Sequence, residues 1–186
     1  MSNKSKVKNG TVLLSEPFSD SGFFHRTAVL MCDVHPKGAL GFCLNKPLDM
    51  QIGELVRDFP VFDSEVYCGG PVSNDTLYFL HNLGDLLEGS EKVCDGVYWG
   101  GNFKELKVFI ENEMITPDRI RFFVGYSGWE PGQLDEEMED GHWVLADMDA
   151  NYLFKSNPYD LWQKIMKNKG TPYHVIAEIP DSISWN

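Results

Sequence analysis

The chain has 186 residues, 42% of them hydrophobic, and a formal net charge of −12 at pH 7. This length predicts a single domain whose core needs neither disulfide nor metal support. The charge disfavours direct nucleic-acid binding, because an acidic surface repels phosphates, and no apolar run approaches the roughly 18 residues of a membrane span.

The N-terminal stretch MSNKSKVKNG is basic and polar, and no apolar segment of the kind found in a secretory signal follows it. We therefore expect a flexible basic arm at residues 1–9 and a cytoplasmic location without membrane attachment. The cysteines, Cys32, Cys43, Cys68 and Cys94, include no C-x-x-C pair. They are predicted to be buried free thiols, as is usual in a reducing compartment.

Short β-type runs bounded by glycine or proline make up most of the chain. We predict strands at 11–15, 27–34, 39–45, 65–68, 76–81, 96–99, 119–126 and 142–147. The segment HPKGALG, at 35–41, is expected to connect two antiparallel neighbours. The reason is that Pro36 fixes one dihedral angle and Gly38 can take a positive φ.

Helical periodicity occurs in three places. The first is 49–59, where apolar residues recur at three- and four-residue steps. The second follows Asn102, which can cap a helix over 103–114, with Glu105 placed to complete a capping box. The third covers 158–170, after an Asn-Pro start that is typical of a helix N-terminus.

The irregular order of strands and helices predicts one α+β domain over 10–170 with about three flanking helices. Residues 171–186 are predicted to form a C-terminal extension. Alternating apolar residues at 175–179 are compatible with a short strand there. We favour an extension packed on the domain, or on a neighbouring molecule, over a disordered end.

The stretch RFFVGYSGWEPGQLDEEM, at 121–138, places a serine between glycines, after a β-type run and before an acidic, helix-like segment. This order resembles a nucleophile elbow, but the second glycine comes one residue early and the bulky Trp129 follows it. We interpret 125–129 as a turn, with Ser127 as a turn residue or ligand contact rather than a nucleophile. The carboxylates at 135–140 are expected to form the solvated face of a helix.

Other signatures of catalysis or ligand binding are missing from the sequence. The histidines lack metal-ligand spacing and no glycine-rich phosphate motif occurs, so we predict no catalytic residue, metal or cofactor. The Gly-Gly-Pro of CGGPVS permits a tight turn, which we favour, or a close backbone approach. Glycine-rich turns beside polar and aromatic residues predict a crevice for a ligand or partner. Its predicted residues are His35, Asn45, Pro47, Gly69, Gly70, Pro71, His81, Gly125, Tyr126, Ser127, Gly128, Trp129, Gln133 and Glu137.

Trp129 separates two interpretations of this region. As a core residue it would be buried among aliphatic and aromatic side chains with no cavity beside it. As a crevice wall its ring would be partly exposed beside polar groups such as Asn45, His81 or Gln133. We favour the crevice, because the flanking glycines and Pro131 give this segment a fixed shape that a buried anchor alone would not need.

The same segments carry a resemblance to the AlgH/YqgE family. The stretches FHRTAVLMCDVHPKGALGFCLNKPL, VYCGGPVSNDTLYFLH and GYSGWEPGQLDEEMEDGHWV follow the order of that family's motifs. The resemblance covers about 10–170 and implies an α+β fold with a bifurcated, mixed or antiparallel sheet folded into a pseudo-barrel. It also implies that alanine is tolerated at the position of Ser127, and it assigns no catalytic role. Glu130 departs from the family pattern, in which a small residue is common.

What the resemblance implies about function is broad. Some members are described as transcriptional regulators because of a link to exopolysaccharide production. The shaped turns and the incomplete catalytic set predict a non-enzymatic binding or regulatory domain for a small molecule or protein, with any effect on transcription exerted through a partner. The alternative is an enzyme that uses His35, His81 or a carboxylate such as Glu137.

Overall fold

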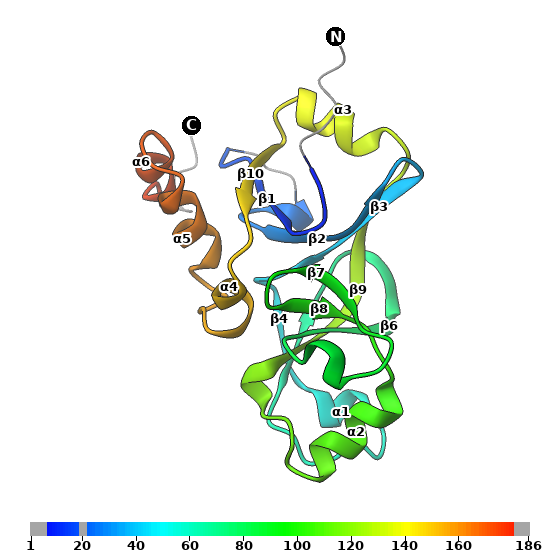
Figure 1. The fold of residues 1–186 in the computed structure, drawn as a ribbon. Coiled ribbons are helices and arrows are strands. Elements are labelled where there is room, and N and C mark those ends of the chain that lie inside the picture. Colours follow the sequence, from blue (N-terminus) through cyan, green and yellow to red (C-terminus); the bar gives the residue numbers. More distant parts are fainter. Residues whose placement is uncertain (1–6, 19–21, 181–186) are drawn as a thin grey trace.

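The computed structural model describes residues 7–18 and 22–180. The molecule is elongated, with a long curled sheet between helices at both ends and further helices along one side (Figure 1). Most of the predicted basic arm, at 1–6, and Trp185 lie outside the described residues. In the part of the chain that the structure describes, no helix is long and apolar enough to cross a membrane.

Within the described residues, ten strands form one continuous sheet. The main path runs in the order β10-β1-β2-β3-β9-β6-β8-β7, and β4 and β5 lie off it. The strands are β1 (Thr11–Ser15), β2 (Ala28–His35), β3 (Gly38–Cys43), β4 (Pro47–Gln51), β5 (Glu65–Cys68), β6 (Val72–His81), β7 (Glu91–Cys94), β8 (Val97–Trp99), β9 (Ile120–Trp129) and β10 (Trp143–Asp147).

The sheet forks at β9, which has three neighbours. The end of β9 pairs with β3, where Ser127 lies opposite Gly41. Its first part pairs antiparallel with β6 and parallel with β5, where Phe122 lies opposite Phe79 and Val66 respectively. The predicted α+β class and the bifurcated, mixed sheet are therefore confirmed.

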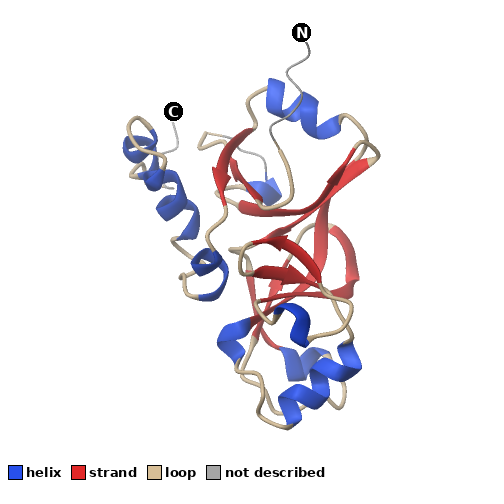
Figure 2. Ribbon diagram, in the orientation of Figure 1, coloured by secondary structure: helices blue, strands red, loops and turns tan. Residues whose placement is uncertain are grey.

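Helices lie outside this sheet (Figure 2). The described residues contain six α-helices, where about three were predicted, and most of the additional ones have only one or two turns. They are α1 (Ile52–Leu55), α2 (Phe103–Glu111), α3 (Gln133–Glu139), α4 (Ala150–Phe154), α5 (Leu161–Asn168) and α6 (Tyr173–Ala177), and three short 3₁₀ turns occur at Gly22–Phe24, Gly84–Leu86 and Pro117–Arg119.

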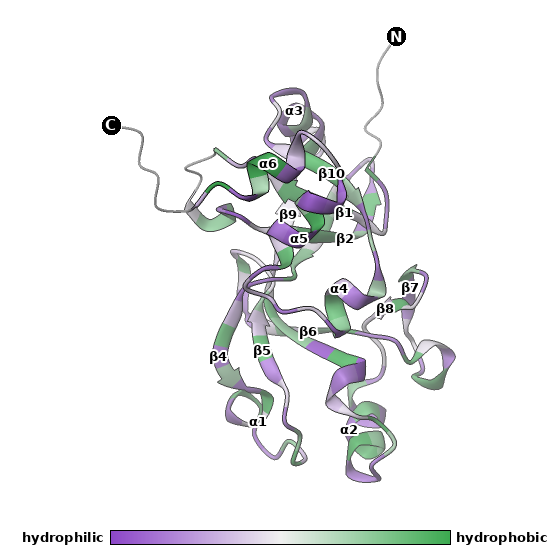
Figure 3. Ribbon diagram, turned by 90° about the vertical axis from the view of Figure 1, so that its left-hand side faces the viewer, coloured by the Kyte–Doolittle hydropathy of each residue, from purple (hydrophilic) through white to green (hydrophobic). Residues whose placement is uncertain are grey.

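Three apolar clusters hold these layers together. Trp162 and Met166 of α5 pack against β1 and β2, and Leu106 of α2 packs against Phe122 of β9. A third cluster lies under α3 and contains Trp129. Both hydrophobic and hydrophilic colours occur on α2 and α5 in Figure 3, as expected for helices that bury one face.

Two local predictions from the sequence are confirmed. The segment at 35–41 does connect antiparallel strands, since His35 pairs with Gly38, whose φ is +135°. Asn102 caps α2 and accepts hydrogen bonds from the backbone of Lys104 and Glu105. The predicted capping box is wrong, however, because the Glu105 carboxylate accepts the backbone N–H of Glu88 at 2.8 Å instead.

The helix predicted at 49–59 is mostly wrong. Residues up to Gln51 form β4, in which Gln51 pairs with Glu65, and only Ile52–Leu55 is helical. Asp49 has a φ of +52°, which is incompatible with a right-handed helix. Pairing with β5 and burial of Ile52 therefore prevail over the apolar periodicity.

The C-terminal region also differs from its predicted outline. Helix α5 begins at Leu161, because Asn157 instead closes a local turn by accepting the N–H of Tyr159 at 3.1 Å. The short strand considered for 175–179 is wrong, since Tyr173–Ala177 is helical. Ala177 is 1% exposed and joins the cluster that contains α5.

Candidate ligand-binding site

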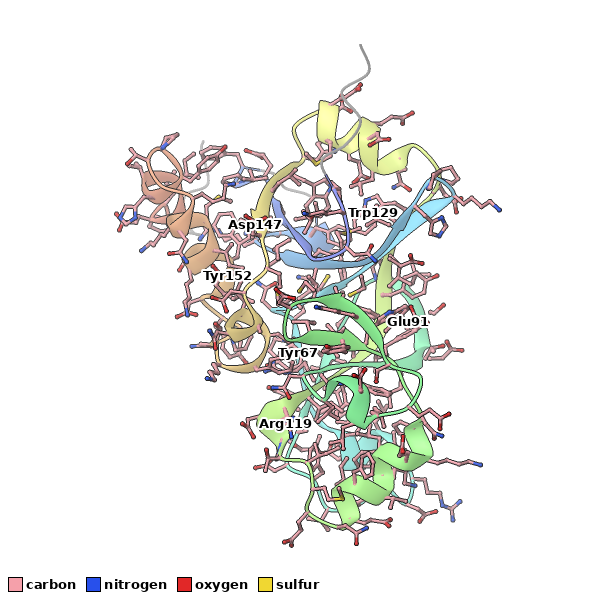
Figure 4. All side chains as sticks on the ribbon, viewed as in Figure 1. Tyr67, Glu91, Arg119, Trp129, Asp147 and Tyr152 are labelled. Atoms are coloured by element: carbon pink, nitrogen blue, oxygen red, sulfur yellow. The ribbon has the colours of Figure 1, made fainter. Side chains whose placement is uncertain are left out.

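The predicted turn at 125–129 is a strand. Each residue of this segment belongs to β9, and Trp129 lies opposite Ala39 of β3. The chain turns only afterwards, at Glu130–Gly132, where Gly132 adopts φ +83° and starts α3. Trp129 is thereby fixed at the end of a strand, directly below α3 (Figure 4).

The carboxylate of Glu137 joins three elements. One of its oxygens, Oε2, accepts the indole N–H groups of Trp129 at 2.8 Å and Trp143 at 2.7 Å. The other, Oε1, accepts the side-chain amide of Gln133 at 2.9 Å. Because these donors come from β9, β10 and α3, the carboxylate holds the helix against the sheet.

The local sequence of α3 explains why Glu137 faces this way. Gln133 and Glu137 are four residues apart and so share one helix face. The Gln133 oxygen also accepts the backbone N–H of Glu130 at 3.0 Å, which ties the turn to the helix. Leu134 is 7% exposed and packs in the cluster with Trp129.

Aromatic rings enclose the region next to this carboxylate. The centroids of Trp129 and Trp143 are 6.1 Å apart, with ring planes at 73°. Phe24 approaches Trp143 at 5.4 Å with its plane at 75°. These edge-to-face contacts form a corner of rings that stand close to perpendicular to one another.

A hollow of about 320 Å³ opens beside this corner, and we call it the Trp129 hollow. It is lined by Ser15, Phe24, Pro71, Gly128, Trp129, Gln133, Glu137, His142 and Trp143. Its size falls at the lower end of the range of small-molecule sites, and its lining combines apolar walls with a few polar groups. The chemistry available is thus recognition by rings, one carboxylate, one amide and one imidazole.

A larger hollow of about 470 Å³ shares Gly128, Trp129 and Gln133 with the Trp129 hollow. It includes His35, Tyr126 and Gln133. The two hollows together bring seven of the fourteen predicted crevice residues to one region. These are His35, Pro71, Tyr126, Gly128, Trp129, Gln133 and Glu137.

The other predicted residues have structural roles away from the hollows. Asn45 accepts the N–H of Ala28 and donates to the carbonyl of Arg26, each at 2.9 Å. Pro47 lies in β4 opposite Tyr67. Ser127 is fully buried and donates to the carbonyl of Gly69 at 3.1 Å.

The glycine pair at 69–70 allows close packing against β9 and is not a free turn. A Cβ on Gly69 would lie 2.3 Å from the carbonyl oxygen of Gly125, and one on Gly70 would lie 2.1 Å from the carbonyl carbon of Tyr126. Gly125 has φ +70° and faces the carbonyl oxygens of Gly70 and Val72. The alternative of close backbone approach, which we did not favour from sequence, is the correct one.

His81 is a buried structural histidine. Its Nδ1 accepts the backbone N–H of Leu83 at 3.2 Å, so Nε2 carries the proton and donates to the carbonyl of Gly100 at 2.9 Å. Burial lowers the pKa of this imidazole below 6.5, and the nearby positive charge of Arg119 lowers it further. The neutral form therefore fits this position.

His35 and His81 cannot share a reaction centre. His81 lies opposite Ile120 at the start of β9, whereas His35 lies near the end of β9. This ten-residue strand is roughly 30 Å long at about 3.3 Å per residue. Figure 4 shows Arg119, which directly precedes β9, well apart from Trp129 at the end of that strand.

Trp129 has features of both interpretations. Its side chain is 6% exposed, which is less than a crevice wall was expected to show, because Trp143 and Glu137 cover it. A hollow and the polar side chain of Gln133 do lie beside it, but Asn45 and His81 do not. The core interpretation, which required the absence of a cavity, does not describe it either.

Sequence reasoning missed four residues of the hollow, namely Ser15, Phe24, His142 and Trp143. Phe24 is the first residue of the first family-like stretch and Trp143 is the next-to-last residue of the third, so both were within the quoted motifs. The aromatic side chains of these two residues could have suggested a binding role, but only the fold brings the two rings together.

Neither metal ligation nor disulfide formation is indicated in the described residues. They contain no group of three or more His, Cys, Asp or Glu side chains placed to hold a metal ion. The cysteines are free thiols as predicted, with Cys32 and Cys43 buried and the other two half-buried. Burial raises the pKa of Cys43 to about 12, so this thiol is protonated and weakly nucleophilic.

A second apolar groove, of about 350 Å³, lies elsewhere, between β6, β8 and α2. Trp99 and Phe103 line it, and it contains none of the predicted crevice residues. It offers a natural reference surface for mapping where a ligand binds.

Comparison with known proteins gives consistent results. The profile of the AlgH-like family matches residues 12–174. A "UPF0301 protein" from Chlorobium luteolum is 41% identical over 176 residues, which cover 95% of this chain and 93% of the relative. Another from Cytophaga hutchinsonii is 37% identical over 175 residues, which cover 94% of this chain and 96% of the relative.

Two solved structures share the fold. The crystal structure of protein DIP2367 from Corynebacterium diphtheriae has a TM-score of 0.79 and 19% identity, covering 96% of this chain and 95% of its own. The solution structure of the AlgH protein from Pseudomonas aeruginosa has a TM-score of 0.74 and 21% identity, covering 97% of this chain and 98% of its own.

Proposed function

Because this chain belongs to the AlgH-like family, as the family profile and its relatives show, we propose that it is a binding domain whose ligand site is the Trp129 hollow. We place it in the cytoplasm, a location that its four free thiols support. Any influence on transcription then runs through a partner, since the net charge of −12 opposes contact with DNA.

This proposal rests on the carboxylate of Glu137, which extends from α3 to the tryptophans of the sheet. A carboxylate that accepts two indole N–H groups and one amide fixes the walls of the hollow before any ligand arrives. Such pre-organisation lowers the conformational cost of binding. The few polar side chains and the aromatic walls together have the composition of a recognition site.

The enzymatic alternative has weaker support. Ser127 is buried within β9, and both nitrogens of His81 are bonded to neighbouring groups. His35 is about half-exposed and lies 3.6 Å from Asp33, but no nucleophilic side chain within the described residues is hydrogen-bonded to its ring. A general base must reach the proton that it removes, and Nδ1 of this imidazole is already engaged by the backbone N–H of Lys37 at 3.1 Å.

A thermal-shift screen of metabolites and short peptides tests the proposal. We expect ligands that raise the Tm of the wild-type protein and lose this effect in Gly128→Leu. Gly128 lines both hollows and is exposed, so a leucine there protrudes into the space beside Trp129 at the cost of a small shift of the Tyr126 ring. Ligands that stabilise both proteins equally, or turnover of a substrate by the wild type, would contradict the proposal.

A further inference from the structure

Three aromatic side chains contribute to the lining of the Trp129 hollow. They are Phe24, Trp129 and Trp143. The ring plane of Trp143 makes an angle of 75° with that of Phe24 and of 73° with that of Trp129. Ring faces carry negative electrostatic potential and attract cations that lie within about 6 Å of the ring centroid. A corner made of three such rings can contact one cationic group from several directions.

Glu137 is the one carboxylate among the described residues of this lining. All three hydrogen bonds to Glu137 come from neutral donors, two indoles and one amide. Among the described residues no lysine or arginine forms an ion pair with Glu137, and the hollow is lined by neither residue type. Among the described residues of the lining, His142 is the only basic side chain.

The hydrogen bonds already made also restrict which cation fits. A carboxylate offers about four acceptor positions, and Glu137 has three of them occupied. The Gln133 oxygen is engaged as well, by the N–H of Glu130. A primary ammonium or a guanidinium brings several N–H donors, and few acceptors remain for them here. A quaternary ammonium carries its charge without any donor.

We propose that the Trp129 hollow binds an alkylated ammonium group, held by the three rings and the charge of Glu137. This inference rests on the proposed binding function and specifies its ligand class. The net charge of −12 favours the approach of a cation from solution. The group can belong to a free small molecule or to a methylated lysine side chain, since both present the same chemistry.

Choline is the first probe, and its neutral carbon isostere dimethylbutanol is the matched control. The full-length, ¹⁵N-labelled protein is titrated with each, and the indole N–H signals of Trp129 and Trp143 are followed. We expect choline to shift both signals and to bind at least tenfold more tightly than the isostere. Ethanolamine, a primary ammonium, should also bind more weakly. A trimethyllysine peptide tests the second source of the group.

Two variants locate the interaction. Glu137→Gln should weaken choline binding at least tenfold, whereas Glu139→Gln, an equal charge change on the exposed part of α3, should not. Phe24→Leu keeps an apolar wall, so it should weaken binding of choline while leaving the isostere unchanged. This second variant decides the question if Glu137→Gln folds poorly.

The outcomes separate this inference from the proposed function. Equal binding of choline and dimethylbutanol, or no binding of any ammonium probe, overturns the assignment of a cation site. In that event neutral or anionic members of the metabolite library that shift the same two indole signals still support a binding domain. If no library member shifts them, the proposed function fails as well.

Discussion

Replacing Glu137 by alanine should destabilise the protein by removing one acceptor from two buried donors. Trp129 and Trp143 are 6% and 7% exposed, and both indole N–H groups point at the same carboxylate oxygen. Leaving a buried donor unsatisfied costs about 1–3 kcal/mol, so two of them cost about 2–6 kcal/mol. Water can enter from the adjacent hollow, which places the expected loss near 3 kcal/mol.

The assay is chemical and thermal denaturation of Glu137→Ala and of Glu139→Ala, which removes an exposed carboxylate from the same helix. A loss of about 3 kcal/mol lowers the Tm of a domain of this size by roughly 6–12 °C. Glu137→Gln keeps an acceptor and should lose only about 1 kcal/mol, because neutral hydrogen bonds are about half as strong as charge-assisted ones. If Glu137→Ala matches Glu139→Ala in stability, the carboxylate does not hold the tryptophans and the reasoning is refuted.

Three further predictions follow from the fold. Gly70→Ala should lower the free energy of unfolding by at least about 3 kcal/mol or prevent folding, since its Cβ would meet backbone atoms of β9. Gly53→Ala, with open space around it, should stay within about 1 kcal/mol of the wild-type stability in urea melts. Burial lowers the pKa of His81, so the unfolded chain binds more protons below about pH 6.5. Stability should therefore fall as the pH drops from 7.5 to 5.5, and a His81→Gln variant with an equally steep fall would contradict this. Deleting residues 171–186 exposes the surface that α6 covers and should lower the Tm or change the oligomeric state measured by light scattering. If neither the Tm nor the oligomeric state changes, this extension does not pack on the domain or on a neighbouring molecule.

Local signals in the sequence were sufficient where the chain determines its own conformation. The 35–41 connection and the Asn102 cap depend on neighbouring residues, and both were predicted correctly. The strand at 125–129 was not, because its residues pair with distant strands: 127–129 with β3, and Tyr126 with Val72 of β6. A Gly-x-Ser-Gly segment looks like a turn until those partner strands are known.

The candidate site was predictable only in part for a related reason. Trp129, Gln133 and Glu137 lie close together in the sequence, so a motif could identify them. Trp143 joins them through β10, which pairs with β1 at the far end of the sheet from β7. Asn45 and His81 also belong to the family-like stretches, yet their side chains form hydrogen bonds with backbone groups elsewhere and do not line the hollow.

The most direct test of the binding account is to follow the indole N–H signals of the tryptophans while ligands that raise the Tm are added. Trp129 and Trp143 line the proposed site, whereas Trp99 lines the separate groove. The account predicts that the signals of Trp129 and Trp143 move together with the ligand concentration, while that of Trp99 stays in place. Ligands that stabilise the protein but move Trp99 alone would contradict it.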